Sequence, residues 1–135
     1  MDLGKCKSLK TCLGPDPYGQ IVPITDFFDG NDDVGSIGCN LSPHPGVDIF
    51  RDVLTGLLRQ PDVEAVYAQI SELDPGEDSW PFTDTVLVAG RISGDDLRSA
   101  VSSLQPDEVG DSKAFGVSPS IAERHGSPVL VVWWD

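Results

Sequence analysis

The sequence predicts an α+β fold, a two-layer sandwich in which an antiparallel sheet carries two helices on one face. Three observations predict it. Apolar residues recur with helical spacing over 46–60 and again over 93–104. Segments 63–73 and 83–92 read as strands separated by the turn at 74–78, and 129–134 is a short apolar run. With a strand candidate at 36–41 the order is βαββαβ, which is ferredoxin-like.

The elements are justified in chain order. Residues 20–24 are a short strand that Pro23 confines to a sheet edge, and Thr25 is the expected cap of a following turn. The helix over 46–60 ends before Pro61, and its apolar stripe comprises Ile49, Phe50, Val53, Leu54, Leu57 and Leu58. Ser93 caps the second helix. We expect 107–126 to be irregular, with a short helix after Pro119.

The length of 135 residues predicts one domain with a single core. Residues 1–19 show no clear periodicity and contain Gly14-Pro15-Asp16-Pro17, so we expect a loosely ordered N-terminal arm there. Residues 20–135 then form the single α+β domain.

The chain is strongly acidic: 22 Asp+Glu against 9 Lys+Arg give a formal net charge of −13. Three of the basic residues lie in the first ten positions. The negative field of such a domain attracts basic partners and disfavours nucleic acid and anionic membranes. No apolar run approaches the roughly 20 residues that cross a bilayer, and the N-terminus lacks a signal-peptide core. We therefore expect a cytoplasmic protein.

Three cysteines, Cys6, Cys12 and Cys39, are an odd number without a CxxC pair. Free thiols are expected in a reducing compartment, with a Cys6–Cys12 disulfide as the alternative. Cys39 and His44 both flank the start of the helix over 46–60, as a catalytic dyad would. The other interpretation places Cys39 in the core as a small apolar side chain. We favour the second interpretation and expect no catalytic residue.

The segment Asp29-x-Asn31-x-Asp33 has the alternating oxygen ligands that open a calcium loop. The match fails further on, because Val34 stands where glycine is required and Asn40 where a closing Glu is required. The pattern instead favours a turn whose side chains bind their own backbone. We expect neither a metal ion nor another cofactor.

Acidic loops are the remaining candidates for function. One cluster lies around position 30, a second between 74 and 84, and a third comprises Asp107, Glu108 and Asp111. The predicted partner-binding residues are Asp29, Asp32, Asp33, Asp74, Glu77, Asp78, Trp80 and Asp84. Trp80 is either an interface anchor or a plug under the 63–92 hairpin, and both interpretations stay open. Trp133 and Trp134 should face opposite sides of the last strand.

The segments FFDGNDDVGSIGCNLSPHPG, SWPFTDTVLV, LQPDEVG and VLVVWWD give the chain a resemblance to small acidic immunity proteins of bacterial toxin–immunity systems, including contact-dependent inhibition and polymorphic toxin systems. The resemblance lies in size, acidity, element order and a loop rich in Trp and acids. It implies a protein that binds and neutralises a cognate basic toxin domain.

Two alternatives of other classes remain. One is a small enzyme or ligand-binding domain with a pocket on the sheet face. The other is an accessory domain that self-associates through a strand edge at 129–134.

Overall fold

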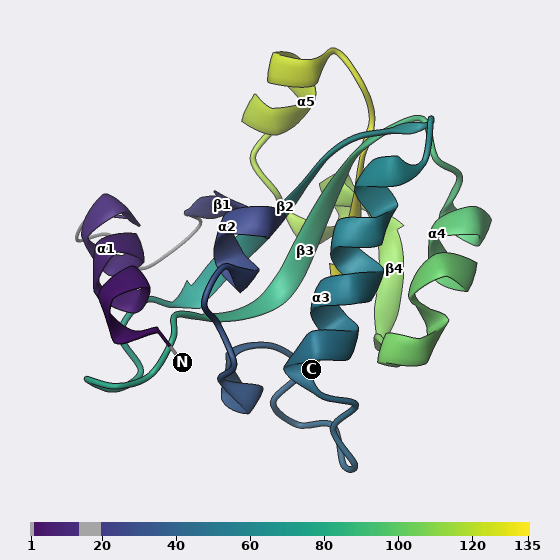
Figure 1. Cartoon of the computed structure of the whole chain (residues 1–135). Coiled ribbons are helices and arrows are strands. Elements are labelled where there is room, and N and C mark those ends of the chain that lie inside the picture. The colour runs from purple at the N-terminus through teal and green to yellow at the C-terminus, as the bar shows by residue number, and fades with distance from the viewer. Residues whose placement is uncertain (1, 14–19) are drawn as a thin grey trace.

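A five-stranded antiparallel sheet organises the chain in the computed structural model, which describes residues 2–13 and 20–135 (Figure 1). The helices and strands are α1 (Leu3–Leu13), β1 (Ile21–Pro23), α2 (Ile24–Phe28), α3 (Val47–Gly56), β2 (Val63–Glu72), β3 (Phe82–Gly90), α4 (Gly94–Val101), β4 (Glu108–Asp111), α5 (Ser120–His125) and β5 (Val129–Trp133). Four short 3-10 turns are η1 (Val34–Ser36), η2 (Leu57–Arg59), η3 (Ser102–Leu104) and η4 (Ser112–Phe115). None of the described helices is long and apolar enough to cross a membrane.

The strands follow the spatial order β1-β2-β3-β5-β4. The long β2–β3 hairpin forms the middle of the sheet, with Val66 opposite Val88 and Ala68 opposite Val86. The predicted α+β class and antiparallel sheet are confirmed. The order helix, strand, strand, helix, strand is also present from α3 to β5, with β4 and α5 inserted before the last strand.

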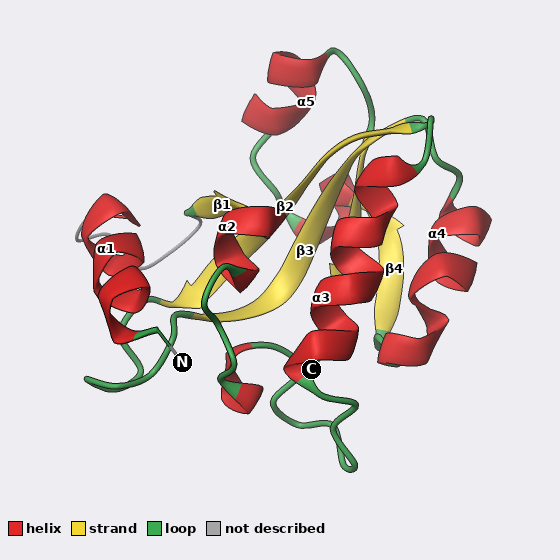
Figure 2. Cartoon of the chain, in the orientation of Figure 1, coloured by secondary structure: helices red, strands yellow, loops and turns green. Residues whose placement is uncertain are grey.

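Helices α3 and α4 lie side by side on one face of the sheet (Figure 2), as the sequence predicts. The main core lies beneath them and contains Phe50, Leu54 and Leu97, none of which is measurably exposed. Trp134 completes this core: its ring lies 5.5 Å from that of Phe50, and its Nε1–H donates to the Leu104 carbonyl at 2.9 Å.

The opposite face of the sheet carries a second, smaller apolar cluster. Ile121 of α5 packs there on Tyr67, Leu87 and Val131. Trp133 packs against this cluster and is partly buried, so the prediction that the two terminal tryptophans face opposite sides is confirmed. The alternative of self-association through residues 129–134 is wrong, because β5 is paired on both sides by β3 and β4.

Several local predictions need correction. Residues 36–41 form no strand; Ile37 makes only an isolated parallel bridge to Thr83, and its carbonyl is bound by the His44 side chain. Helix α2 begins at Ile24 without a side-chain cap, so Thr25 is not its cap. The acidic segment after Pro106 contains β4, an edge strand whose short, mostly polar sequence gives little strand signal. The edge position of Pro23, the Ser93 cap and the short helix after Pro119 are confirmed.

The N-terminal segment also departs from expectation, because residues 3–13 form helix α1. Cys6 is buried, and Leu9, Lys10 and Leu13 are partly buried, which is an i, i+3, i+4, i+7 face. A cysteine and a lysine within this face obscured the periodicity. The rest of the expected arm, residues 14–19, lies outside the described residues.

We predict that Gly90→Ala destabilises the protein by about 3 kcal/mol, measured by urea unfolding. Gly90 has φ of +145°, and a Cβ there would lie 2.1 Å from the Asp62 carbonyl oxygen. The matched control is Gly56→Ala in α3, where a Cβ meets nothing within 4 Å. That change should raise stability by up to about 1 kcal/mol. Equal effects at the two positions would contradict the close approach at Gly90.

Candidate functional site

The acidic loop before η1 is built by its own side chains. The Asn31 Oδ1 accepts from the Asp33 amide at 2.9 Å, and Asp33 Oδ1 accepts from the Gly35 amide at 3.0 Å. Asn31 is 5% exposed and its Nδ2 donates to the Ser36 hydroxyl at 3.0 Å. These bonds confirm the predicted turn. Among the residues that the structure describes, no group of His, Cys, Asp or Glu is arranged to hold a metal ion.

The second oxygen of Asp33 joins this loop to the β2–β3 connection. Its Oδ2 accepts from the Trp80 amide, 47 positions away, at 3.0 Å, so one carboxylate binds backbone donors from two segments far apart in the chain. Asp33 is partly buried in this arrangement. The structure therefore gives Asp33, predicted to bind a partner, a role in positioning the two acidic loops.

Trp80 is fully buried and belongs to the main core. Its Nε1–H has no hydrogen-bond partner among the described residues. This decides between the two interpretations left open by the sequence: Trp80 is the plug beneath the hairpin. Its prediction as an interface anchor is wrong, because a side chain without exposed area cannot contact a partner on the folded protein.

Helix α1 docks on the acidic loops through two lysines. Lys5 Nζ lies 2.6 Å from Asp29 Oδ1, and Lys10 Nζ lies 2.9 Å from Asp74 Oδ1. Lys10 also donates to the Gly76 carbonyl at 2.9 Å. The hydrogen bond and charge of Asp29 raise the pKa of Lys5 above its usual 10.5.

Cys6 lies between these two ion pairs along α1. Its side chain is 2% exposed, and its Sγ donates to the Ser79 carbonyl at 3.4 Å. Burial raises the pKa of the Cys6 thiol above its usual 9.0. The expectation of free thiols is confirmed, whereas the expected burial of Cys39 is wrong: Cys39 and Cys12 are exposed. Without a strand at 36–41, Cys39 has no apolar layer to enter.

The structure brings part of the predicted site together around α1. Asp29 binds Lys5, while Asp74, Glu77 and Asp78 line an open pocket with residues of the helix. We call Asp29, Asp74, Glu77 and Asp78 the acidic surface. All four are exposed.

Other predicted acids lie apart from this surface. Asp84 accepts from the Thr85 hydroxyl at 2.7 Å and lines a different pocket, next to Asp135. Asp107, of the third cluster, accepts from the Asp135 amide at 2.6 Å. Asp32 is exposed near η1. The predicted residues therefore do not form one continuous site.

His44 has a structural role. Its Nε2 donates to the Ile37 carbonyl at 2.8 Å, and its Nδ1 accepts from the Gly46 amide at 2.9 Å. The ring also packs on Phe50, with centroids 5.2 Å apart. Because both ring nitrogens bind backbone groups, neither is available as a base for Cys39.

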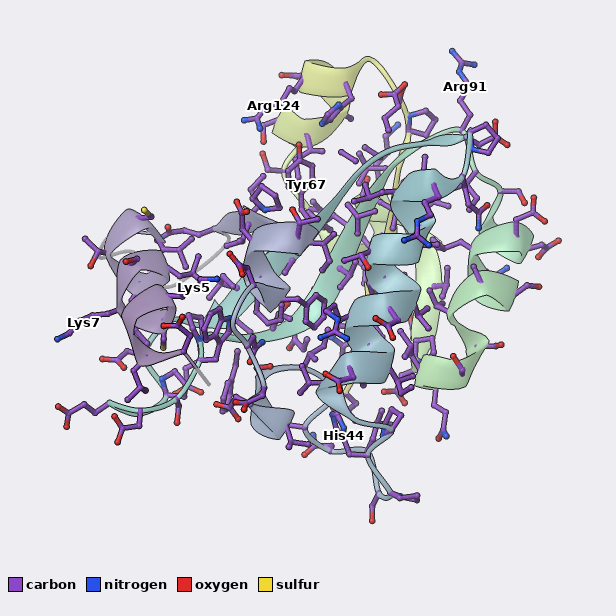
Figure 3. The ribbon with its side chains drawn as sticks, viewed as in Figure 1. Lys5, Lys7, His44, Tyr67, Arg91 and Arg124 are labelled. Carbon is purple, nitrogen blue, oxygen red and sulfur yellow. The ribbon has the colours of Figure 1, made fainter. Side chains whose placement is uncertain are left out.

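Sequence analysis missed a polar chain beneath α5. The Tyr67 hydroxyl lies 2.9 Å from His125 Nε2, and His125 Nδ1 lies 3.7 Å from Glu64 Oε2. Ser127 Oγ donates to Glu64 Oε1 at 2.7 Å. The groups come from β2, from the last residue of α5 and from Ser127 just after it, a pairing that only the folded chain reveals. Figure 3 shows Tyr67 directed from the sheet toward α5, and this chain ties the helix to β2.

Comparison with known proteins identifies the family. The model of the "Uncharacterized protein YfbO family" matches residues 6–130, from within α1 to within β5. The chain belongs to the YfbO family. A curated relative, the uncharacterized protein YfbO of Escherichia coli strain K12, is 26% identical over 123 residues, covering 90% of this chain and 86% of the relative. No solved structure shows significant similarity. Both acidic loops and most of α1 lie inside the region matched by the YfbO family.

We predict that Asp33→Asn lowers the free energy of unfolding by about 1–3 kcal/mol, measured by urea unfolding. One oxygen becomes an NH₂ group, so one of the two backbone N–H donors of Gly35 and Trp80 loses its acceptor. Glu77→Gln is the matched control, because the substitution removes the same charge from an exposed carboxylate in the same region. Similar losses in both variants would show that charge, and not the bridging geometry, matters at Asp33.

We also predict that the protein loses stability as pH rises from about 8 to about 10.5. Because burial raises the pKa of Cys6, its thiol stabilises the fold fully below its unfolded value of 9.0 and loses that contribution as pH rises toward its folded value, whereas the corresponding loss for Lys5 begins only near 10.5. The fall in the urea midpoint should be smaller in Cys6→Ala. Cys12→Ala, which removes an exposed thiol from the same helix, should behave as the parent protein. The same fall in all three would exclude Cys6 as its cause.

Proposed function

We propose that this chain is an acidic protein-binding module that binds and neutralises a cognate basic toxin domain, as do the immunity proteins that its sequence resembles. The docking of α1 carries the proposal. The acidic surface holds Lys5 and Lys10 at 2.6 and 2.9 Å. Carboxylates that bind lysines of the chain's own helix have the chemistry and spacing to bind lysines or arginines of another protein.

The charge of the whole molecule supports the same proposal. A net charge of −13 steers a basic partner toward the surface and raises the rate of association at low salt. Glu77 and Asp78 are exposed and make no ion pair with another described residue. They therefore offer negative charge that the helix leaves uncompensated. Inhibition by binding requires neither a catalytic residue nor a cofactor.

The neighbouring genes supply the test. Each of their products is expressed in a sensitive host, alone and together with this chain. We predict that one product arrests growth, and that co-expression restores growth. Purified partner should associate more slowly as salt rises, because the attraction is screened.

Glu77→Gln with Asp78→Asn should slow association by about tenfold at low salt while leaving the urea midpoint unchanged. The matched control is Asp95→Asn with Asp96→Asn, which removes two exposed charges from α4, on the opposite side of the molecule from α1 (Figure 1). Neighbouring products that never arrest growth, or an affinity indifferent to salt and to both charge variants, would contradict the proposal.

A further inference from the structure

Helix α1 differs in charge from everything to which it is attached. It contains Lys5, Lys7 and Lys10 and no acidic residue, a net charge of +3. The other 124 residues hold 22 acids and six Lys or Arg residues, a net charge of −16. Electrostatic attraction therefore draws this helix to the body, while the body repels itself.

The carboxylates of both α1 ion pairs lie at the surface, whereas Lys10 itself is 17% exposed and its contact with the Gly76 carbonyl, like that of Cys6 with the Ser79 carbonyl, is partly buried. The Lys5 and Asp29 side chains are 51% and 62% exposed, and Asp74, the partner of Lys10, is 68% exposed. Exposed ion pairs contribute little stability and are screened by salt. Figure 3 shows Lys7 extending into solvent, away from the body.

The apolar contact under α1 is small. Cys6 is its single buried residue, whereas α3 buries Val47, Phe50 and Leu54. An open pocket of about 410 Å³ lies between α1 and the β2–β3 connection, lined in part by Lys7, Asp74 and Glu77. Figure 1 shows α1 at the margin of the molecule, away from the face covered by α3 and α4. The helix thus spans an open pocket and meets the main core through Cys6, Leu9 and Leu13, so its release would expose that side of the core and leave the strand pairing of the sheet untouched.

We propose that α1 is a releasable strap: in the docked state its lysines occupy Asp29 and Asp74 of the acidic surface, and its release frees these two carboxylates and exposes the side chain of Cys6 while the sheet stays folded. As regulation of the acidic surface, this rests on the proposed function. The docked helix occupies Asp29 and Asp74, so a basic partner competes with Lys5 and Lys10 for the same carboxylates.

Salt separates strap release from unfolding of the whole protein. Screening weakens the attraction between α1 and the acidic loops, so added salt favours release. Screening also relieves the self-repulsion of the acidic body, so added salt favours the folded body. Labelling of Cys6 through release therefore becomes faster with salt, whereas labelling through global unfolding becomes slower.

The experiment measures the rate at which iodoacetamide labels each cysteine of the native, reduced protein, resolved by peptide mass spectrometry. We expect Cys6 labelling to accelerate at least about threefold between roughly 20 mM and roughly 500 mM NaCl. Cys12 and Cys39, exposed on the helix and on the body, report the effect of salt on the chemical reaction itself. The urea midpoint should stay constant or rise over the same range.

Lys5→Gln with Lys10→Gln should accelerate Cys6 labelling about tenfold at low salt and abolish most of its salt dependence. The matched control is Lys7→Gln, which removes the same type of charge from the same helix at a side chain that makes no ion pair with another described residue. Cys6 labelling that slows with salt, or that follows the urea midpoint in every variant, would overturn the strap.

The two proposals fail separately. Cys6 labelling needs no partner, so it tests the strap whether or not a toxin is found. If co-expression does not restore growth but Cys6 labelling responds to salt as expected, the toxin-binding function is refuted and the strap stands.

Discussion

The arrangement of the acidic loops depends on the Asp33 carboxylate. One of its oxygens ends the turn before η1, and the other binds the amide of Trp80 in the β2–β3 connection. The amide belongs to a residue whose indole is locked in the core, so Asp33 ties a surface loop to a fixed point. Asp29 and Asp74 are thereby held close enough for the lysines of a single helix to reach both. In the sequence Asp33 is one of many acidic residues, and only the structure shows that it positions the two acidic loops.

Helix α1 reduces the charge repulsion that the acidic surface imposes on the folded protein. Carboxylates gathered on a small domain repel one another, and a basic helix laid among them offsets part of that repulsion. Lys5 and Lys10 lie five positions apart and reach loops that are 45 positions apart in sequence. Both carboxylates of these ion pairs are exposed, so salt screens the pairs and weakens the attachment.

The proposed binding function rests on surface charge and not on the tryptophan that the sequence analysis named as an anchor. The tryptophan expected to contact a partner is a core residue, and His44, the candidate base for Cys39, binds backbone groups with both ring nitrogens. The match to the YfbO family covers residues 6–130 and does not by itself indicate a reaction or a ligand. The acidic surface and the helix whose lysines bind two of its carboxylates remain the features that a binding function can use.

The sequence by itself determined the α+β class, the two helices α3 and α4, the β2–β3 hairpin and the opposite orientations of Trp133 and Trp134. These follow from local periodicity, which the chain carries regardless of its surroundings. Tertiary structure decided the burial of Trp80, the exposure of Cys39, the interior position of β5 and the docking of α1. Apart from the exposure of Cys39, each depends on what a distant segment supplies: an acceptor for the Trp80 amide, a second strand beside β5, or carboxylates for two lysines. Local pattern cannot encode these partners, because they meet only when segments far apart in the chain are brought together.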